Sequence, residues 1–155
     1  MDQIKIQQAS IDELPTLLEF EQAIVEYERP FEKNMQTEKF NYYDLEALIL
    51  SDKAEVLVAK SDDKLVGSGY AKIRKSEHYI KNKYHAFFGF MYVDPDYRGL
   101  GINKLIVEKL IAWSRAQNMK SISLTVYNEN ESAIKAYEKT GFNKHLIEMR
   151  LDISQ

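Results

Sequence analysis

The stretch Val93-Asp94-Pro95-Asp96-Tyr97-Arg98-Gly99-Leu100-Gly101-Ile102-Asn103 decides how the fold of this chain is interpreted. An apolar run from Phe87 leads into it, and a segment whose apolar residues recur at helical spacing follows it. This order predicts a strand, a tight turn with two glycines, and a helix. The first backbone N–H groups of such a helix lack partners within the helix and carry the positive end of its dipole, so they can bind an anion.

The two glycines of this turn favour a phosphate as that anion. Because Gly99 and Gly101 lack a Cβ atom, a phosphate can approach the backbone, and either residue can adopt a positive φ. Arg98 adds a positive charge at the mouth of the turn. Two glycines alone are equally compatible with a plain strand-to-helix turn. A dinucleotide fingerprint is excluded by Lys104 in place of a third small residue, and a P-loop by the lack of Gly-Lys-Ser/Thr.

The turn resembles motif A of the GCN5-related N-acetyltransferase (GNAT) superfamily, whose phosphate loop reads Q/R-x-x-G-x-G/A. The matching stretch is Arg98-Gly99-Leu100-Gly101-Ile102-Asn103. Five of the six positions fit, and Asn103 replaces the usual last small residue. The resemblance implies that these six residues bind coenzyme A. The Asn103 side chain crowds that end of the loop, although asparagine tolerates left-handed backbone.

A second stretch is similar to motif B of the same superfamily, N-x-x-A-x-x-x-Y-x-x-x-G-F. All five defined positions match: Asn130, Ala133, Tyr137, Gly141 and Phe142. Two motifs in the right order are more specific than either alone, and the resemblance covers nearly the whole chain. It implies one N-acetyltransferase domain, 1–155, with a GNAT-like α/β fold in which helices flank a mixed, mostly antiparallel central sheet.

Composition and charge exclude several other classes of protein. The chain has 155 residues, 45% of them hydrophobic and 29% charged, which is ordinary for a globular domain able to bury its own core. A net charge of -3 without a basic tail argues against nonspecific nucleic-acid binding. The lack of cysteine excludes disulfides, thiolate metal sites and a cysteine nucleophile, and we expect no metal. No apolar run approaches a membrane span and Met1 to Ile11 is too polar for a signal peptide, so a cytoplasmic location is expected.

Hydrophobic periodicity predicts the remaining elements. Strands are expected at Ile4–Gln8, Ala54–Lys60, Leu65–Ile73, Tyr84–Val93 and Ser121–Val126, with a last extended segment at Phe142–Ile153. Helices are expected at about 11–24, at 42–50, at 102–118 and from Asn128 or Asn130 to Thr140. Because Tyr84–Val93 is apolar on both faces, it is predicted to be a central strand covered on both sides. The predicted order is β-α-α-β-β-β-α-β-α-β, with a crossover after the central strand.

The resemblance also implies a reaction, namely direct transfer of an acetyl group from acetyl-CoA to an amine. The backbone N–H groups of Met91, Tyr92 and Val93 are expected to bind the acyl oxygen and the pantetheine arm, and a donor aimed at an oxyanion lowers a barrier by several kcal/mol. Tyr137 is expected to protonate the leaving sulfur or to stabilise it by a hydrogen bond. From the residue type alone, a core tyrosine with its hydroxyl at the rim is the favoured interpretation of Tyr137, and its position in motif B reverses that preference. Asn130 is expected to bind the cofactor arm or to cap its helix.

The base that takes the proton of the amine is not assigned by the sequence. Many GNAT enzymes place a glutamate on the central strand, but no carboxylate occurs in Ala86–Met91. Three glutamates near the kink after the first helix and two histidines are candidates: Glu26, Glu28, Glu32, His78 and His85. Each is also explained as a surface charge or a structural histidine. A relay through ordered water or an acceptor of lower pKa would need no dedicated base.

The acceptor amine is defined only broadly by the sequence. Several aromatic residues could line an acceptor pocket or a core: Phe31, Phe40, Tyr42, Tyr43, Tyr70, Phe88 and Phe90. A small-molecule amine such as a polyamine, amino acid or antibiotic, and a peptide or protein amino group, all stay open. A noncatalytic acyl-CoA sensor or scaffold of the same fold is the alternative function. A homodimer is compatible with the resemblance, but no interface is located.

Overall fold

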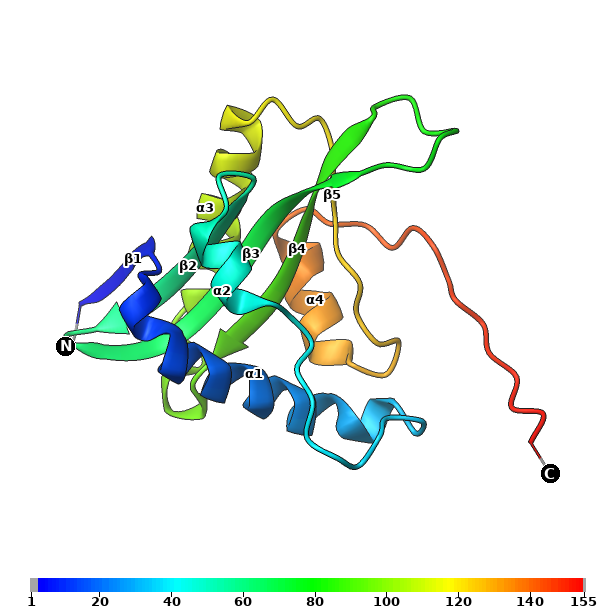
Figure 1. Cartoon of the computed structure of the whole chain (residues 1–155), viewed down its shortest axis with the longest axis horizontal. Coiled ribbons are helices and arrows are strands. Elements are labelled where there is room, and N and C mark those ends of the chain that lie inside the picture. The colour runs from blue at the N-terminus through cyan, green and yellow to red at the C-terminus, as the bar shows by residue number, and fades with distance from the viewer. Residues whose placement is uncertain (1–2, 155) are drawn as a thin grey trace.

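A computed structural model describes residues 3–154, in which one five-stranded sheet has the order β1-β2-β3-β4-β5 (Figure 1). The strands are β1 Ile4–Gln8, β2 Ala54–Ser61, β3 Lys64–Lys75, β4 Tyr84–Val93 and β5 Ile122–Ser123. Neighbouring strands from β1 to β4 are antiparallel, and β5 is parallel to β4. The mixed, mostly antiparallel sheet predicted from the resemblance is therefore confirmed.

Within the part of the chain that the structure describes, four α-helices flank this sheet. They are α1 Leu14–Glu28, α2 Leu45–Leu50, α3 Ile102–Ala116 and α4 Glu131–Lys139. Short 3-10 turns lie before α1 at Ile11–Glu13, after α1 at Arg29–Phe31, and before the glycine turn at Pro95–Tyr97. The predicted helix from Tyr42 begins later, at Leu45, because the Asp44 side chain accepts a hydrogen bond from the Ala47 N–H and so caps α2 there.

The helices form two layers, one on each face of the sheet (Figure 1). Leu17, Phe20 and Ile24 of α1 and Leu45 of α2 share one core with inward residues of the sheet. On the other face, α3 supplies most of the buried side chains: Ile102, Ile106, Val107 and Leu110. Since β4 contributes residues to both cores, it is the central strand covered on both sides that the sequence predicts.

The two predicted C-terminal strands differ from expectation. The strand predicted at Ser121–Val126 pairs with β4 only over Ile122–Ser123, because the chain diverges from β4 beyond Ser123 (Figure 1). The predicted last strand, Phe142–Ile153, is wrong as a member of the sheet. The segment is extended, but after Gly141, where φ is +105°, it runs clear of the sheet and pairs with no described strand.

None of the helices formed by residues 3–154 combines the length and the apolar composition that crossing a membrane requires.

Candidate functional site

The glycine turn between β4 and α3 has the backbone that the sequence predicts. Gly99 and Gly101 both have φ of 80°, and Gly101 caps α3. A Cβ atom built on either glycine would meet no heavy atom within 4 Å, so the left-handed backbone, and not crowding, requires glycine here. The same open space leaves room for a bound group beside the turn.

The first turn of α3 presents free backbone donors to this space. The Leu105 N–H is the first to bond within the helix, to the Gly101 carbonyl at 3.1 Å. The N–H groups of Ile102, Asn103 and Lys104 therefore have no partner inside the helix. The Ile102 side chain is 1% exposed in the α3 core and fixes the position of the helix start. The exposed N–H groups and the helix dipole make this an anion site.

The other residues of the predicted phosphate loop lie around the same turn. Arg98 and Leu100 are exposed, and Asn103 is half-buried. The Lys104 ammonium lies 3.9 Å from the Glu108 carboxylate on the surface of α3. Arg98 is thus an exposed positive residue directly before Gly99.

Strand β4 contains a bulge just before this turn. Tyr70 pairs with Gly89, and the next paired residues are Ser68 and Tyr92, so β4 has one more residue than β3 between the two pairs. Phe90 takes a φ of 60°, which is rare for a residue with a side chain. The Ser68 hydroxyl donates to the Phe90 carbonyl over 3.0 Å and holds the extra residue in place. This arrangement is a β-bulge.

The bulge changes which residues of β4 face each layer. Before it, Ala86 and Phe88 pack in the α3 core. After it, Met91 and Val93 pack against that core, whereas Phe90 packs in the α1 core. Even-numbered residues of β4 therefore face the α3 core before the bulge, and odd-numbered residues face it after the bulge.

The edge of β4 that faces β5 is open beyond the bulge. Among the described residues, β4 and β5 pair only at Ala86–Ile122 and Phe87–Ser123. The Asp94 N–H donates to the Val66 carbonyl on the β3 side, over 2.8 Å.

Since N–H groups alternate along a strand, the Tyr92 N–H also points toward β3. Those of Met91 and Val93 point toward the open edge. Two of the three donors predicted from the resemblance thus face a gap that leads to the glycine turn.

Tyr137 of α4 lies on the α3 side of this gap. Its ring packs edge-on against Phe142, with 5.8 Å between ring centroids, and Phe142 packs against Phe88. Burial, and then the charge of Glu28, raise the pKa of Tyr137 to about 12. The hydroxyl therefore stays protonated at neutral pH and can donate a hydrogen bond.

Glu28, the last residue of α1, faces side chains from three other segments. Burial raises the pKa of its half-buried carboxyl, and a hydrogen bond from the Tyr42 side chain opposes that rise. Burial and then the Glu28 charge raise the pKa of Tyr42, of Tyr127 and of Tyr137. The Glu28 charge thus acts on tyrosines of the loop before α2, of the segment after β5 and of α4, and the Tyr42 side chain forms a hydrogen bond with it.

The other glutamates near the kink have different surroundings. Glu26 forms an ion pair with Arg29, with 3.2 Å between Oε1 and Nη2, and its side chain is 67% exposed. Glu32 accepts hydrogen bonds from the Asn34 N–H and the Arg150 side chain, and these lower its pKa. A lowered pKa makes Glu32 a weaker base than Glu28.

Neither candidate histidine lies near Tyr137. His85 sits at the start of β4, at the opposite end of the strand from the glycine turn, and its Nδ1 lies 2.9 Å from the Ser76 hydroxyl. Burial lowers the pKa of His85. His78 stacks edge-on against Tyr79 in the connection between β3 and β4. The structure therefore separates both histidines from the converging tyrosines.

Most of the predicted aromatic residues form a continuous row on the α1 side of the sheet. Phe40 contacts Tyr42, Tyr42 contacts Tyr43, and Tyr43 contacts both Tyr70 and Phe90, with ring centroids 5.4–5.6 Å apart. The buried Glu21 carboxylate anchors this row by accepting the Tyr43 N–H over 2.7 Å.

Two members of the predicted set lie outside the row. Phe31 packs against Tyr127 near Glu28, with ring centroids 6.0 Å apart. Phe88 lies in the core on the opposite face of the sheet. It therefore belongs to the packing behind Tyr137 and not to the row of tyrosines.

Asn130 occupies the N-cap of α4 and is 7% exposed. Its side-chain oxygen accepts a hydrogen bond from the Ala133 N–H over 3.4 Å. The capping role that the sequence leaves open is therefore present.

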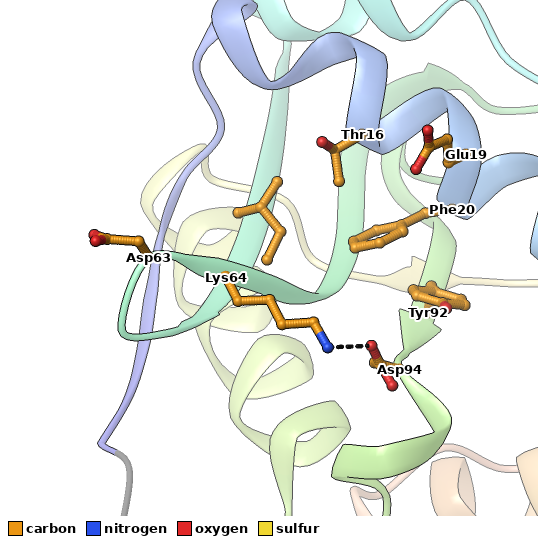
Figure 2. A pocket seen from close by; sticks show the side chains of 8 residues that line it. Thr16, Glu19, Phe20, Asp63, Lys64, Tyr92 and Asp94 are labelled. Atoms are coloured by element: carbon orange, nitrogen blue, oxygen red, sulfur yellow. Dashed lines mark ion pairs between the residues drawn. The ribbon is translucent and has the colours of Figure 1, made fainter.

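A hollow on the α1 side of the sheet lies apart from Glu28 and Tyr137. It has a volume of about 500 Å³ and is lined by α1, the turn between β2 and β3, and the end of β4 (Figure 2). Lys64 and Asp94 form an ion pair across it, with 3.3 Å between Nζ and Oδ2. Tyr92 of the predicted cofactor-binding residues lines this hollow, but Glu28 and Tyr137 do not.

Three features of the site are not evident from the sequence. Tyr127 and Ser68 do not belong to the matched motif positions, and the positive φ of Phe90 has no glycine to indicate it. Gly89, which directly precedes Phe90, is a local signal for a bulge, because glycine inside a strand often marks one. The approach of Tyr127 to Glu28 depends on segments that are 99 positions apart in the sequence and carries no local signal.

Comparison with known proteins agrees with this geometry. Residues 20–142 match the family model described as the Acetyltransferase (GNAT) family. A mycothiol acetyltransferase from Geodermatophilus obscurus is 29% identical over 101 residues, which cover 63% of this chain and 32% of that protein. The chain spans less than half the length of the curated relatives it matches.

Solved structures show the same fold. A mutant form of a Bacillus halodurans protein superposes with a TM-score of 0.87 at 19% identity, covering 97% of this chain and 99% of that one. A Clostridium acetobutylicum protein, described as a predicted acetyltransferase and solved with acetyl-CoA, has a TM-score of 0.76 at 14% identity and covers 97% of both chains. The family model spans most of the sequence, from within α1 to the end of the second matched motif at Phe142. This chain therefore belongs to the Acetyltransferase (GNAT) family.

Proposed function

We propose that this protein is an acetyl-CoA-dependent N-acetyltransferase that moves an acetyl group directly to an amine within a ternary complex. Family membership and the acetyl-CoA complex of one structural neighbour support acetyl-CoA as the cosubstrate. The single observation that carries the proposal is the bulge of β4. It turns the N–H groups of Met91 and Val93 toward an open strand edge that ends at the glycine turn.

The residues of the turn fit the phosphate end of coenzyme A. The free N–H groups at the start of α3 and the Arg98 side chain would hold the pyrophosphate, in the open space beside Gly99 and Gly101. When bound, the cosubstrate supplies an acetyl group activated as a thioester. Asn130, which caps α4, would contact the arm of the cosubstrate with its side-chain amide.

The open edge of β4 would orient and polarise the acyl group. The Met91 N–H would donate to the carbonyl oxygen as negative charge develops there, and the Val93 N–H would hold the arm. Removing a preorganised donor of this kind raises the activation barrier by about 3–4 kcal/mol.

Glu28 would serve as the general base. Its carboxylate would attract a cationic amine and take one proton from it, so that the neutral amine attacks the acyl carbon. The second proton would leave the nitrogen to water as the C–S bond breaks and the thiolate departs. A raised pKa suits this role, because a base is more effective when its pKa lies nearer the working pH. The surrounding tyrosine rings would favour a primary amine carried on a small molecule or a peptide, since cations are attracted to aromatic faces.

Tyr137 would stabilise the leaving sulfur by a hydrogen bond as the C–S bond breaks. A phenol with a pKa of about 12 is a far weaker acid than a thiol with a pKa of about 8.5. Complete proton transfer to the sulfur would be uphill by about 5 kcal/mol. The environment of Tyr137 therefore supports donation of a hydrogen bond more than transfer of the proton.

The proposal is tested by thiol release from acetyl-CoA in the presence of a panel of amines. Because the chain has no cysteine, a thiol reagent reports only the coenzyme A that is set free. Turnover with at least one class of primary amine is expected. Acetyl-CoA binding by calorimetry without turnover on any class would instead indicate the acyl-CoA sensor, and no binding at all would contradict both functions.

A further inference from the structure

A cluster of basic and aromatic side chains lies on the α1 side of the sheet, where β3 runs beside the start of β4. In the strand register, Lys72 pairs with Phe87 and Arg74 pairs with His85. The Lys72 ammonium lies 6.0 Å from the centroid of the Phe87 ring, and the Arg74 guanidinium carbon lies 3.6 Å from it. Phe87 packs against the α1 core, so both cations are on that face of the sheet. Two positive charges are thus held over one aromatic ring, which attracts cations.

The positive charge of this cluster is not balanced by a carboxylate. No ion pair within residues 3–154 includes Lys72 or Arg74. Burial, and then the Arg74 charge, lower the pKa of Lys72 and of His85. Residues 72–85 include five Lys or Arg residues and one acidic residue, although the net charge of the chain is -3. This hairpin, which extends beyond the rest of the sheet in Figure 1, is therefore a positive region of an acidic molecule and attracts anions.

An exposed face of β5 and the chain after it adjoins this cluster. Phe87 pairs with Ser123 across the β4–β5 contact. Ser123 and Thr125 are exposed, whereas Ile122 and Leu124 pack against the α3 core. Because side chains alternate along an extended chain, Ser123 and Thr125 face the same side of the sheet as Phe87. Their hydroxyl groups are thus presented beside the two cations.

The same strip leads to the proposed general base. Tyr127 follows Thr125 by two positions, and Phe31 from the end of α1 packs against its ring, with centroids 6.0 Å apart. Burial, and then the Glu28 charge, raise the pKa of Tyr127. The four residue steps from Ser123 to Tyr127 span at most about 14 Å. The strip therefore has a carboxylate near one end and two cations near the other, within reach of one small molecule.

We propose that the acceptor amine carries an anionic group, a phosphate monoester or a carboxylate, which Lys72 and Arg74 bind while the amine lies at Glu28. This substrate class rests on the transferase activity proposed above and narrows it. The fork of an arginine side chain matches the oxygens of both anions, and Lys72 adds a second positive charge. The acceptor would lie along Ser123 and Thr125, whose hydroxyls can donate and accept hydrogen bonds. A polyamine, which is cationic at both ends, would be repelled by the cluster.

Matched acceptors test this substrate class through thiol release from acetyl-CoA. Linear ω-amino compounds of equal length are compared, ending in a phosphate, a carboxylate, a neutral amide or a second amine, and the comparison is repeated at several lengths. At the best length, kcat/KM for the phosphate or the carboxylate is expected to exceed that for the amide about 10- to 100-fold, as hydrogen bonds to charged groups allow. The diamine is expected to react more slowly than the amide. Equal values for charged and neutral acceptors at every length would overturn the inference and leave the transferase activity intact.

Two variants of β3 separate a specific anion site from a general effect of charge. Arg74→Gln is expected to raise KM for the anionic acceptor about tenfold and to leave kcat unchanged, because a remote group is bound equally in the ground state and the transition state. Lys75→Gln removes the same charge from the next residue, whose exposed side chain lies on the other face of the strand. This matched control is expected to keep the wild-type KM. Equal changes in the two variants would overturn the inference.

Calorimetry distinguishes failure of the substrate class from failure of the proposed function. The ω-aminoalkyl phosphate is titrated into the wild type and into Arg74→Gln, each saturated with coenzyme A. Binding is expected to weaken about tenfold in Arg74→Gln, which corresponds to one lost charge-assisted contact. That result without any turnover would support the anion site and contradict the transferase activity. Equal binding by the two proteins, or no binding by the wild type, would overturn the anion site whatever the activity.

Discussion

The donor side and the acceptor side of the site are built in different ways. On the donor side, the bulged end of β4 and the glycine turn present backbone N–H groups, whose positions depend on φ angles at Phe90, Gly99 and Gly101. On the acceptor side, Glu28 and the tyrosines around it present side chains from four segments. Under the proposed function, the backbone of one side could serve any acyl-CoA-dependent reaction, whereas the side chains of the other would decide which amine reacts and how it loses its proton.

The strongest test of this division replaces the base. Glu28→Gln keeps the size of the side chain but removes its ability to accept a proton, so kcat/KM is expected to fall about 10²- to 10³-fold. Affinity for acetyl-CoA is expected to stay within about twofold, because Glu28 belongs to the acceptor side. Steady-state rates and calorimetry measure the two quantities separately. Glu26→Gln, on an exposed ion pair in the same helix, is the matched control and is expected to leave the rate unchanged.

The dependence of the rate on pH gives a second prediction for Glu28. Burial raises the pKa of Glu28 above its usual value, so the wild-type rate should fall as the pH drops through that raised pKa, where the carboxyl becomes protonated. This fall of the rate at low pH should be absent in Glu28→Gln. A profile of the same shape in both proteins would show that another group takes the proton.

The next largest effect should come from the donor side. Gly101→Val forces a β-branched residue to a φ of 80° and is expected to weaken coenzyme A binding by up to about 100-fold, corresponding to about 1–3 kcal/mol of backbone strain. Gly101→Asn should keep most of the affinity, since asparagine tolerates left-handed backbone. Space at the site does not distinguish the two variants, because a Cβ there meets nothing within 4 Å. Equal losses in both, by calorimetry on folded protein, would refute the conformational explanation.

Tyr137 lies where the two sides meet, and its replacement should have a smaller effect. Tyr137→Phe removes one hydrogen bond to a developing thiolate, which lowers kcat by on the order of tenfold and leaves acetyl-CoA affinity unchanged. Because the pKa of Tyr137 is raised to about 12, no ionisation of this phenol should shape the rate below pH 10. A wild-type rate in Tyr137→Phe at every pH would remove Tyr137 from the mechanism.

The same division separates what the sequence predicts from what it does not. The glycine turn, the α4 motif and the two-sided strand β4 follow from local residue order, because φ, capping and periodicity act within a few positions. The choice of Glu28 among three neighbouring glutamates does not, because it depends on tyrosines brought from distant segments. The place of Phe142–Ile153 is also beyond local pattern. Its alternation correctly indicates extended chain but does not determine whether the segment joins the sheet, and in the structure it pairs with no described strand.

The smallest expected effect concerns the bulge, which is supported by one buried hydroxyl. Ser68→Ala removes the bond to the Phe90 carbonyl and should lower the free energy of unfolding by about 1 kcal/mol. It should also reduce kcat/KM a few-fold, because the Met91 N–H loses part of its alignment. Ser114→Ala is the matched control: that hydroxyl is equally buried and donates to the Leu110 carbonyl inside α3, away from the open edge. Denaturant melts and rates on both variants should show similar losses of stability but a loss of rate only for Ser68→Ala. If the rates of the two variants fall together, or neither falls, the bulge does not align the donors and the backbone account of the donor side fails at this point.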